Sequence, residues 1–278
     1  MNILKLAAFS YKGKGGNPAG VAFCDEMPDD AEMLKTAKEV GYSETAFLVK
    51  HADGWRVRYF APEMEVPFCG HATIASGAAL GERFGVGSYK LDLNQGEIGV
   101  SAERSADGAF TATLHSPETW SHDAPKSYAD KILAAFNLNN DSLDPEFPAR
   151  FAFAGAKHLI LMVKERKTLA EMSYPFEAVK TLMAEEGLVT ISIIWRASDE
   201  LFHARNAFAS GGVYEDPATG AAAAALAGYL RDINWQGKKA FTILQGEDMG
   251  VPSRLLVQYG SIAGESVAVS GEVRNINE

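Results

Sequence analysis

Residues 71–82 read HATIASGAALGE, and residues 217–228 read PATGAAAAALAG. Aligned from their first residues, the two stretches carry the same residue at six of twelve positions. Each is almost wholly small or apolar and is predicted to form a helix, and a helix without a polar face is buried on all sides. Because each stretch follows a predicted strand and a loop, the repeat predicts two similar α/β domains, each with a central helix enclosed by sheet.

The chain length and a change in composition set the predicted domain boundary. A chain of 278 residues is long enough for two domains. The segment Ser116–Ser127 holds two prolines and several polar residues, which is typical of a linker. We therefore expect an N-terminal domain over residues 1–116 and a C-terminal domain over residues 117–264. We expect the tail from about residue 265 to 278 to return to the first domain.

The charge of the chain restricts its partners. Lys and Arg number 26 against 36 Asp and Glu, which gives a formal net charge of −10, and no basic cluster occurs. Nucleic acid and anionic membrane surfaces attract basic patches, so neither is an expected partner. A small anionic ligand is compatible with this charge, because one local positive site can oppose the global field.

The sequence predicts no segment for export or membrane insertion. Lys5 interrupts the short apolar run at the N-terminus, so we expect no signal peptide. The uncharged runs 66–81 and 217–230 are too short and too rich in Ala and Gly to span a bilayer. We expect a soluble, cytoplasmic protein.

Several common site types are excluded by their residue patterns. Two cysteines, Cys24 and Cys69, provide neither a disulfide framework nor a cysteine-based zinc site. No two histidines lie four residues apart on a predicted helix, so no metal site is expected. The glycine-rich segment Gly13–Gly20 does not match the dinucleotide-binding fingerprint, because Pro18 stands at its third glycine position. Neither a Walker A motif nor a nucleophile elbow occurs.

The start of each Ala-rich helix is a candidate anion site. At the second helix, Asp216 suits the N-cap and Pro217 the first helical position. At the first helix, Gly70 holds the equivalent position before His71. A helix N-terminus has free N–H groups and a partial positive charge, so two such ends would bind a carboxylate without Lys or Arg.

Small residues at these helix starts leave the backbone accessible. Ala72, Gly220 and Ala221 would let a ligand approach the N–H groups closely. Two such ends facing one cleft would reconcile an acidic protein with an anionic ligand.

Glu44 is the first candidate for chemistry. It lies at the start of a predicted apolar strand, in Ser43-Glu44-Thr45-Ala46-Phe47. Acids are depleted from strands, and the simplest interpretation is a solvent-facing residue at the strand end. The alternative is a general acid/base whose pKa is raised in a dry pocket.

A thiol, an imidazole and a second carboxylate lie at the two helix starts. The segment Phe68-Cys69-Gly70-His71-Ala72-Thr73 places Cys69 and His71 at the first. A cysteine there can have a lowered pKa, although an inert buried thiol is the simpler interpretation. His71 is either structural or catalytic. Asp216, at the second start, can cap its helix and still present one carboxylate oxygen to a cleft.

Five segments occur along the chain in a fixed order. They are Gly16-Asn17-Pro18, Ser43-Glu44-Thr45, Phe68-Cys69-Gly70-His71-Ala72-Thr73, Glu215-Asp216-Pro217-Ala218-Thr219-Gly220, and Gln245-Gly246 with Pro252-Ser253. Together they resemble the phenazine-biosynthesis (PhzF-like) isomerase family, which shares its fold with diaminopimelate epimerase. The third and fourth segments are the specific ones.

The resemblance implies a fold and a set of roles. The fold is a mixed α/β (α+β) architecture of two pseudo-symmetric domains, each a curled, mostly antiparallel sheet or barrel around a central helix, with the active site in the cleft between them. The acid/base glutamate falls on Glu44, the substrate-contacting histidine on His71 and the aspartate on Asp216. No cofactor is needed, and a homodimer is the implied assembly. The residues expected to bind substrate are Asn17, Cys69, Gly70, Ala72, Thr219, Gly220 and Ala221.

The sequence departs from the family pattern at the second helix start. The family often has Ser where this chain has Ala221, so a hydroxyl is missing while the backbone N–H remains. Related epimerases use two cysteines, one on each domain. Cys69 resembles the first, but no cysteine stands at the second helix start.

The sequence therefore leaves three functions open. The leading one is a cofactor-independent isomerase or epimerase that moves a proton on a small carboxylate substrate, with Glu44 as general acid/base. The second is a two-base amino-acid epimerase that uses Cys69 with Asp216 or Glu44. The third is a non-catalytic protein that binds a small molecule.

Overall fold

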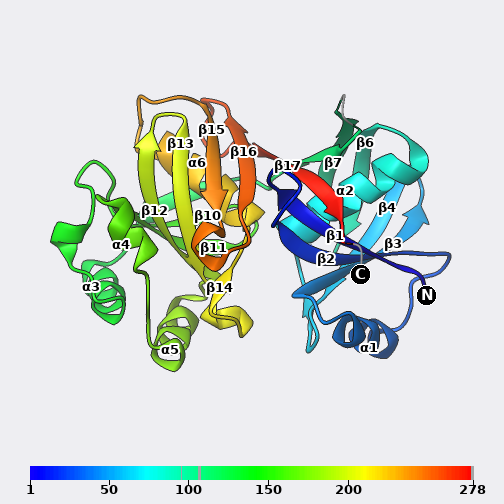
Figure 1. Cartoon of the computed structure of the whole chain (residues 1–278), viewed down its shortest axis with the longest axis horizontal. Coiled ribbons are helices and arrows are strands. Elements are labelled where there is room, and N and C mark those ends of the chain that lie inside the picture. Colours follow the sequence, from blue (N-terminus) through cyan, green and yellow to red (C-terminus); the bar gives the residue numbers. More distant parts are fainter. Residues whose placement is uncertain (95, 106–107, 277–278) are drawn as a thin grey trace. The chain divides into compact units, whose positions relative to one another are not determined.

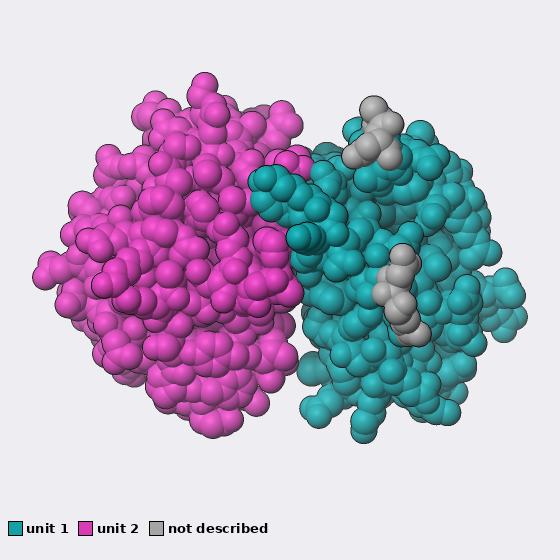
Figure 2. Space-filling view, in the orientation of Figure 1, with its two compact units in different colours: residues 1–116, 268–278 teal, residues 117–267 magenta. Residues whose placement is uncertain are grey.

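The computed structural model describes residues 1–94, 96–105 and 108–276. Contacts divide the chain into two compact units, coloured separately in Figure 2. Unit 1 comprises Met1–Ser116 and the C-terminal segment from Ala268, and unit 2 comprises Pro117–Val267. The last two residues of the predicted returning tail, 277 and 278, lie outside the described residues. No helix within the described ranges has both the length and the apolar character needed to cross a membrane.

The described residues of unit 1 form a sheet and two helices (Figure 1). Its strands are β1 (Ile3–Ser10), β2 (Asn17–Cys24), β3 (Glu44–His51), β4 (Gly54–Phe60), β5 (Glu65–Val66), β6 (Gly87–Leu93), β7 (Gly96–Arg104), β8 (Phe110–His115) and β17 (Val267–Asn275), which begins one residue before the unit boundary. Its helices are α1 (Asp30–Val40) and α2 (Gly70–Phe84).

The sheet of unit 1 closes into a barrel. β2 pairs with β3 in parallel, β3 with β4 antiparallel, and β4 with β6 in parallel over a short stretch. β6, β7 and β8 then follow as antiparallel neighbours. The chain's last strand, β17, pairs antiparallel with both β8 and β1, and β1 pairs with β2. The returning C-terminal strand therefore completes the ring.

Helix α2 fills the barrel of unit 1. Every residue from Gly70 to Gly81 is buried, and the helix packs against β1, β2, β3, β6, β7 and β8. A methyl group on Gly77 would lie 2.5 Å from Val100 Cγ2, so this position admits no side chain without a shift of the barrel wall. The small residues of the helix are what allow strands to surround it closely. The predicted enclosure of an Ala-rich helix by sheet is confirmed.

Unit 2 repeats this plan with additional helices. Its strands are β9 (Trp120–Asp123), β10 (Arg150–Phe153), β11 (Lys157–Val163), β12 (Thr190–Ser198), β13 (Leu201–Ala207), β14 (Glu215–Asp216), β15 (Ala240–Gln245) and β16 (Ser253–Tyr259). Its helices are α3 (Lys126–Ala135), α4 (Arg166–Ala170), α5 (Phe176–Glu186) and α6 (Gly220–Asp232). Within it β11 and β12 run parallel, as do β13 and β15, and the other strand pairs are antiparallel.

Helix α6 is the central helix of unit 2. All its residues from Gly220 to Arg231 are buried, and it packs against β9, β10, β11 and β16. The predicted linker Ser116–Ser127 is only partly irregular, because β9 lies within it and pairs with β10. Three of the four residues of β9 are polar (Ser121, His122 and Asp123), so composition alone does not separate this strand from a linker.

The two units correspond in a register that differs from the one predicted. In unit 1, Glu65-Val66-Pro67-Phe68-Cys69-Gly70 runs from β5 into α2, and in unit 2, Glu215-Asp216-Pro217-Ala218-Thr219-Gly220 runs from β14 into α6. Both segments read Glu, x, Pro, x, x, Gly, and both helices begin at the glycine. Cys69 therefore corresponds to Thr219. The alignment of the Ala-rich stretches instead pairs Thr219 with Thr73, which is one helical turn further along the chain.

Each of these segments begins with a glutamate held by an arginine. Arg58 Nη2 on β4 lies 2.5 Å from Glu65 Oε2, and Arg205 Nη2 on β13 lies 2.5 Å from Glu215 Oε2. Arg205 Nη1 also donates to the carbonyl of Ala170 at 2.9 Å. In both units the pair fixes the short strand that leads into the central helix.

Candidate active site

Local structure places Glu44 at the first position of β3. Helix α1 begins after Asp29, whose side chain accepts a hydrogen bond of 2.8 Å from the Glu32 N–H, and ends at Gly41 with φ 72°. The buried face of α1 packs with Phe47 of β3. The chain therefore passes from the end of α1 into β3, where Glu44 lies opposite Ala19 of β2.

The Glu44 side chain is buried, which decides against the solvent-facing interpretation. The residue is 8% exposed. Burial raises the pKa of the carboxyl group above its ordinary value, while hydrogen bonds from Ser43 and Cys69 oppose that rise. The Oε2 atom is fully buried and accepts no hydrogen bond within the described chain, although His71 Nε2 lies 3.2 Å away. A carboxyl group in this setting is suited to exchange a proton.

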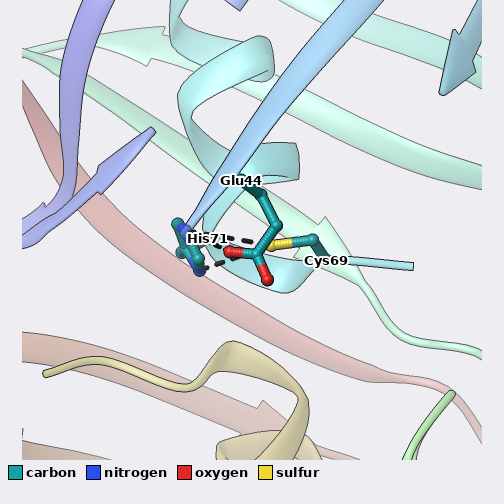
Figure 3. Close-up of side chains that lie close together, drawn as sticks. All are labelled: Glu44, Cys69 and His71. Carbon is teal, nitrogen blue, oxygen red and sulfur yellow. Dashed lines mark hydrogen bonds and ion pairs between the residues drawn. The ribbon is translucent and has the colours of Figure 1, made fainter. Parts of the chain in front are cut away.

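Cys69 and His71 converge on this carboxyl group from the start of α2 (Figure 3). Cys69 is the N-cap residue of the helix, in an extended conformation. Its Sγ lies 3.3 Å from His71 Nδ1 and 3.9 Å from His71 Nε2. The two residues are 7% and 6% exposed, respectively. One ligand-type atom from each of Glu44, Cys69 and His71 lies within 4.8 Å of the others, so the three could also hold a metal ion.

The surrounding residues fix these side chains. Thr73 Oγ1 donates to the Cys69 carbonyl at 2.7 Å and lies 2.7 Å from the hydroxyl of buried Tyr59. Ser43 Oγ lies 3.3 Å from His71 Nε2. The first turn of α2 is therefore held by side chains on both sides, which favours a fixed geometry for acid–base chemistry.

A second cluster lies in unit 2, at the start of α6. The Thr219 hydroxyl donates to Asp216 Oδ2. Gln245 Nε2, at the end of β15, donates to the Asp216 carbonyl at 2.7 Å and to Thr219 Oγ1 at 3.2 Å, while its Oε1 accepts from the Thr219 N–H at 3.2 Å. All three residues belong to one hydrogen-bond network within this unit.

Asp216 is not the N-cap of its helix. The cap residue is Thr219, the helix begins at Gly220, and Asp216 lies in β14 opposite Asn206 of β13. The prediction of Asp216 as N-cap with Pro217 at the first helical position was therefore wrong. Proline fits the segment because it lies three residues before the first residue of the helix, where it donates no hydrogen bond and restricts the backbone.

The structure places the other predicted binding residues at the same elements. Asn17 is buried at the first position of β2, two residues before the partner of Glu44. Gly70 and Ala72 lie in the first turn of α2. Gly220 and Ala221 lie in the first turn of α6, where Ala221 corresponds to His71. The predicted residues thus form two groups, one in each unit.

Two residues of these clusters had no role in the sequence prediction. Ser43 and Gln245 each stand in one of the five segments that carry the resemblance, but neither was given a role. The available signal at Gln245 was a long polar side chain at the end of the apolar strand Ala240–Gln245, directly before a glycine with φ 74°. A buried amide in that position requires hydrogen-bond partners, and the α6 segment provides them.

Comparison with known proteins now assigns the chain. The family model described as phenazine biosynthesis-like protein matches residues 6–275. The chain belongs to the phenazine biosynthesis-like protein family. The resemblance inferred from the five sequence segments is confirmed.

Members of the phenazine biosynthesis-like family carry isomerase names. An uncharacterised isomerase of Bacillus subtilis (strain 168) is 28% identical over 274 residues, covering 94% of this chain and 92% of the relative. The trans-2,3-dihydro-3-hydroxyanthranilate isomerase of Pseudomonas aeruginosa is 28% identical over 272 residues, covering 95% and 91%. These names confirm the predicted enzyme class, an isomerase.

A solved structure of the same family shares the fold. The phenazine biosynthesis protein of the PhzF family from Bacillus anthracis has a TM-score of 0.85 and 22% identity, covering 99% of this chain and 96% of that one. The predicted fold class, a mixed α/β architecture built of curled sheets around central helices, is confirmed.

Proposed function

We propose that this chain is a cofactor-independent isomerase that moves a proton on a small carboxylate substrate, with Glu44 as general acid/base. The observation that carries the proposal is the position of Glu44. Its carboxyl group is buried, has a raised pKa and lies beside a thiol and an imidazole. A general base is most effective when its pKa lies near the operating pH, and burial raises the pKa of a carboxyl group toward that pH.

The proposed reaction is a proton shift without net oxidation. The Glu44 carboxylate takes a proton from a carbon whose acidity is increased by an adjacent unsaturated or carbonyl group. The electron pair left on that carbon moves into the conjugated system, and Glu44 returns the proton to a different carbon. Substrate and product are isomers, and Glu44 ends the cycle ionised, as it began.

The remaining candidate residues orient the substrate. His71 lies 3.2 Å from Glu44 Oε2, so it can hold the carboxylate in position or polarise the substrate beside it. The starts of α2 and α6 each present backbone N–H groups at the positive end of a buried helix, which suits a substrate carboxylate and developing negative charge. Asp216, in unit 2, is also proposed to orient the substrate. A double-mutant cycle between Glu44→Gln and Asp216→Asn on kcat tests whether both act on one substrate.

Deuterium exchange tests the proposal directly. The first substrate to examine is trans-2,3-dihydro-3-hydroxyanthranilate, the compound named for the Pseudomonas aeruginosa relative, followed by other small carboxylic acids in deuterated water. The wild-type chain should incorporate deuterium into its substrate. Glu44→Gln should retain binding and lower turnover by at least about 100-fold. Glu39→Gln, on the exposed face of α1, is the control and should leave turnover unchanged.

Two results would contradict the assignment. Full activity in Glu44→Gln would remove the glutamate from the mechanism. Tight binding of carboxylic acids without any exchange of protons would instead support the non-catalytic alternative.

A second candidate function is favoured by one contact. Cys69 Sγ lies 3.3 Å from His71 Nδ1, and a thiol paired with an imidazole can ionise and act as a base. A two-base amino-acid epimerase would use Cys69 on one face of Cα and a carboxylate on the other. Exchange at Cα of amino acids, abolished in Cys69→Ser but retained in Cys24→Ser, would favour this function over the first.

A further inference from the structure

Glu44, Cys69 and His71 provide an oxygen, a sulfur and a nitrogen atom, respectively, around one point. The three come from β3 and the start of α2, and their side chains point toward one another (Figure 3). All three residues are buried, yet each keeps a small exposed fraction. Cys69 and His71 lie two residues apart at the start of α2, and β3 holds Glu44 beside them. The fold therefore sets the distances among the three side chains.

The distances suit a small tetrahedral ion. A zinc ion bonds sulfur at about 2.3 Å and nitrogen or oxygen at about 2.0–2.1 Å, which separates its ligand atoms by about 3.3–3.6 Å. Here His71 Nε2 lies 3.2 Å from Glu44 Oε2 and 3.9 Å from Cys69 Sγ. All three ligand atoms lie within 4.8 Å of one another, so adjustment of the side chains would bring them to zinc-binding distances.

The buried Oε2 atom of Glu44 is a second, independent indication of a ligand. It is shielded from solvent and accepts no hydrogen bond within the described chain, although His71 Nε2 lies 3.2 Å away. Buried carboxylate oxygens normally have a partner, and leaving one without a hydrogen bond is costly. A cation bound between Oε2, Nε2 and Sγ would satisfy it.

We infer that these three side chains form a binding site for one Zn²⁺ ion, and that Zn²⁺ bound there blocks the proton-transfer reaction. A thiolate and an imidazole select zinc over magnesium and calcium, which prefer oxygen ligands alone. Three protein ligands leave the fourth position for water or a substrate carboxylate. The Cys69 thiol gives up its proton to solvent on binding. Glu44 becomes a metal ligand and can no longer take a proton from substrate, so Zn²⁺ is an inhibitor rather than a cofactor.

Only the inhibition rests on the function proposed above, and binding of the metal can be measured without any substrate. Calorimetric titration of the purified chain with Zn²⁺ in metal-free buffer should give one ion per chain. Cys69→Ser and His71→Gln should each weaken binding at least about tenfold. Cys24→Ser removes the other thiol, which lies on β2 outside the cluster, and should leave binding unchanged.

Two further measurements detect the metal site without relying on Cys69→Ser or His71→Gln, either of which could unfold the chain. In the wild-type chain, Zn²⁺ should protect Cys69 from alkylation by iodoacetamide, as read by mass spectrometry, and a chelator should remove the protection. Cd²⁺ should produce an ultraviolet thiolate-to-metal band in the wild type and in Cys24→Ser.

The outcomes separate the two claims. Absence of Zn²⁺ binding, or alkylation of Cys69 at an unchanged rate in its presence, would overturn the metal site whatever the activity. Binding of Zn²⁺ by a chain that exchanges no proton on any substrate would leave the site in place and overturn the isomerase. Where exchange is found, Zn²⁺ should suppress it and a chelator should restore it. Uninhibited exchange by the zinc-loaded chain would overturn the blocking role.

Discussion

Glu44 couples the stability of the chain to pH. Burial raises its pKa in the folded state above the ordinary value of 4.5, so the folded chain holds a proton that the unfolded chain releases. The stabilising effect of the neutral carboxyl group is fully present below pH 4.5 and is lost as the pH rises through the folded-state pKa. Denaturant unfolding of wild type and Glu44→Gln at a series of pH values measures this difference. The variant should gain stability relative to wild type across that window, and a constant difference would show that Glu44 ionises as if exposed.

Gln245 provides a prediction about positioning. Its amide joins the Asp216 carbonyl and the Thr219 N–H, so Gln245→Leu leaves buried polar groups without partners. Such a loss costs about 1–3 kcal/mol of unfolding free energy. Gln258→Leu, on the exposed side of β16, changes the same chemistry without burial and should cost much less. Chemical denaturation of both variants measures the comparison, and equal costs would show that the Gln245 bonds contribute nothing specific.

At the level of elements, the sequence predicted which helices are central but not where the second one begins. Alanine runs match one another at many offsets, so the alignment of the two Ala-rich stretches carried little information about register. The informative residues are Glu65 and Glu215, which lie in short strands and pair with arginines of the preceding strands. A two-residue strand is too short for periodicity to reveal. Asp216 was consequently assigned to a helix cap, while its actual place in β14 depends on pairing with β13.

The site shows the same division between local and tertiary information. Cys69 and His71 are close in sequence, and their common helix start was predictable from the glycine between them and the apolar run that follows. The proximity of Glu44 to that pair depends on β3 lying beside the start of α2, which no local pattern specifies. The burial of Glu44 likewise results from the barrel, so the sequence left both interpretations of it open.

The fit of α2 inside its barrel predicts a costly substitution. A methyl group at Gly77 would meet Val100 Cγ2 at 2.5 Å and Ala112 Cβ at 3.1 Å. Overpacking of this kind costs about 1–3 kcal/mol, which outweighs the helix propensity that Ala adds. The control is Gly99→Ala on β7, where the nearest atom is His115 Cδ2 at 4.0 Å. Thermal or denaturant unfolding should show destabilisation for Gly77→Ala only. A Gly77→Ala variant as stable as the wild type would show that the barrel strands shift at little cost in unfolding free energy.

The internal repeat extends well beyond the two Ala-rich helices. Both units have a parallel strand pair around a helix (β2–β3 around α1, β11–β12 around α5), then an antiparallel strand, a short strand and a buried helix. The correspondence ends at the C-terminus, because β17 follows the strands of unit 2 along the chain and yet pairs with β1 and β8 of unit 1. The barrel that holds Glu44 therefore depends on the last segment of the sequence.

Removal of β17 tests that dependence. A chain ending at Val267 lacks the strand that joins β1 to β8, so each of these loses a strand partner and the ring of strands around α2 is opened. Hydrogen exchange should show loss of protection at α2 and β8, whereas α6 and β11–β13 of unit 2 should keep theirs, since none of their strand partners is removed. A chain shortened only by residues 277 and 278 is the control. If α2 remained protected without β17, the barrel would be held by its other strand pairs alone, and the C-terminal strand would have no part in shaping the Glu44 site.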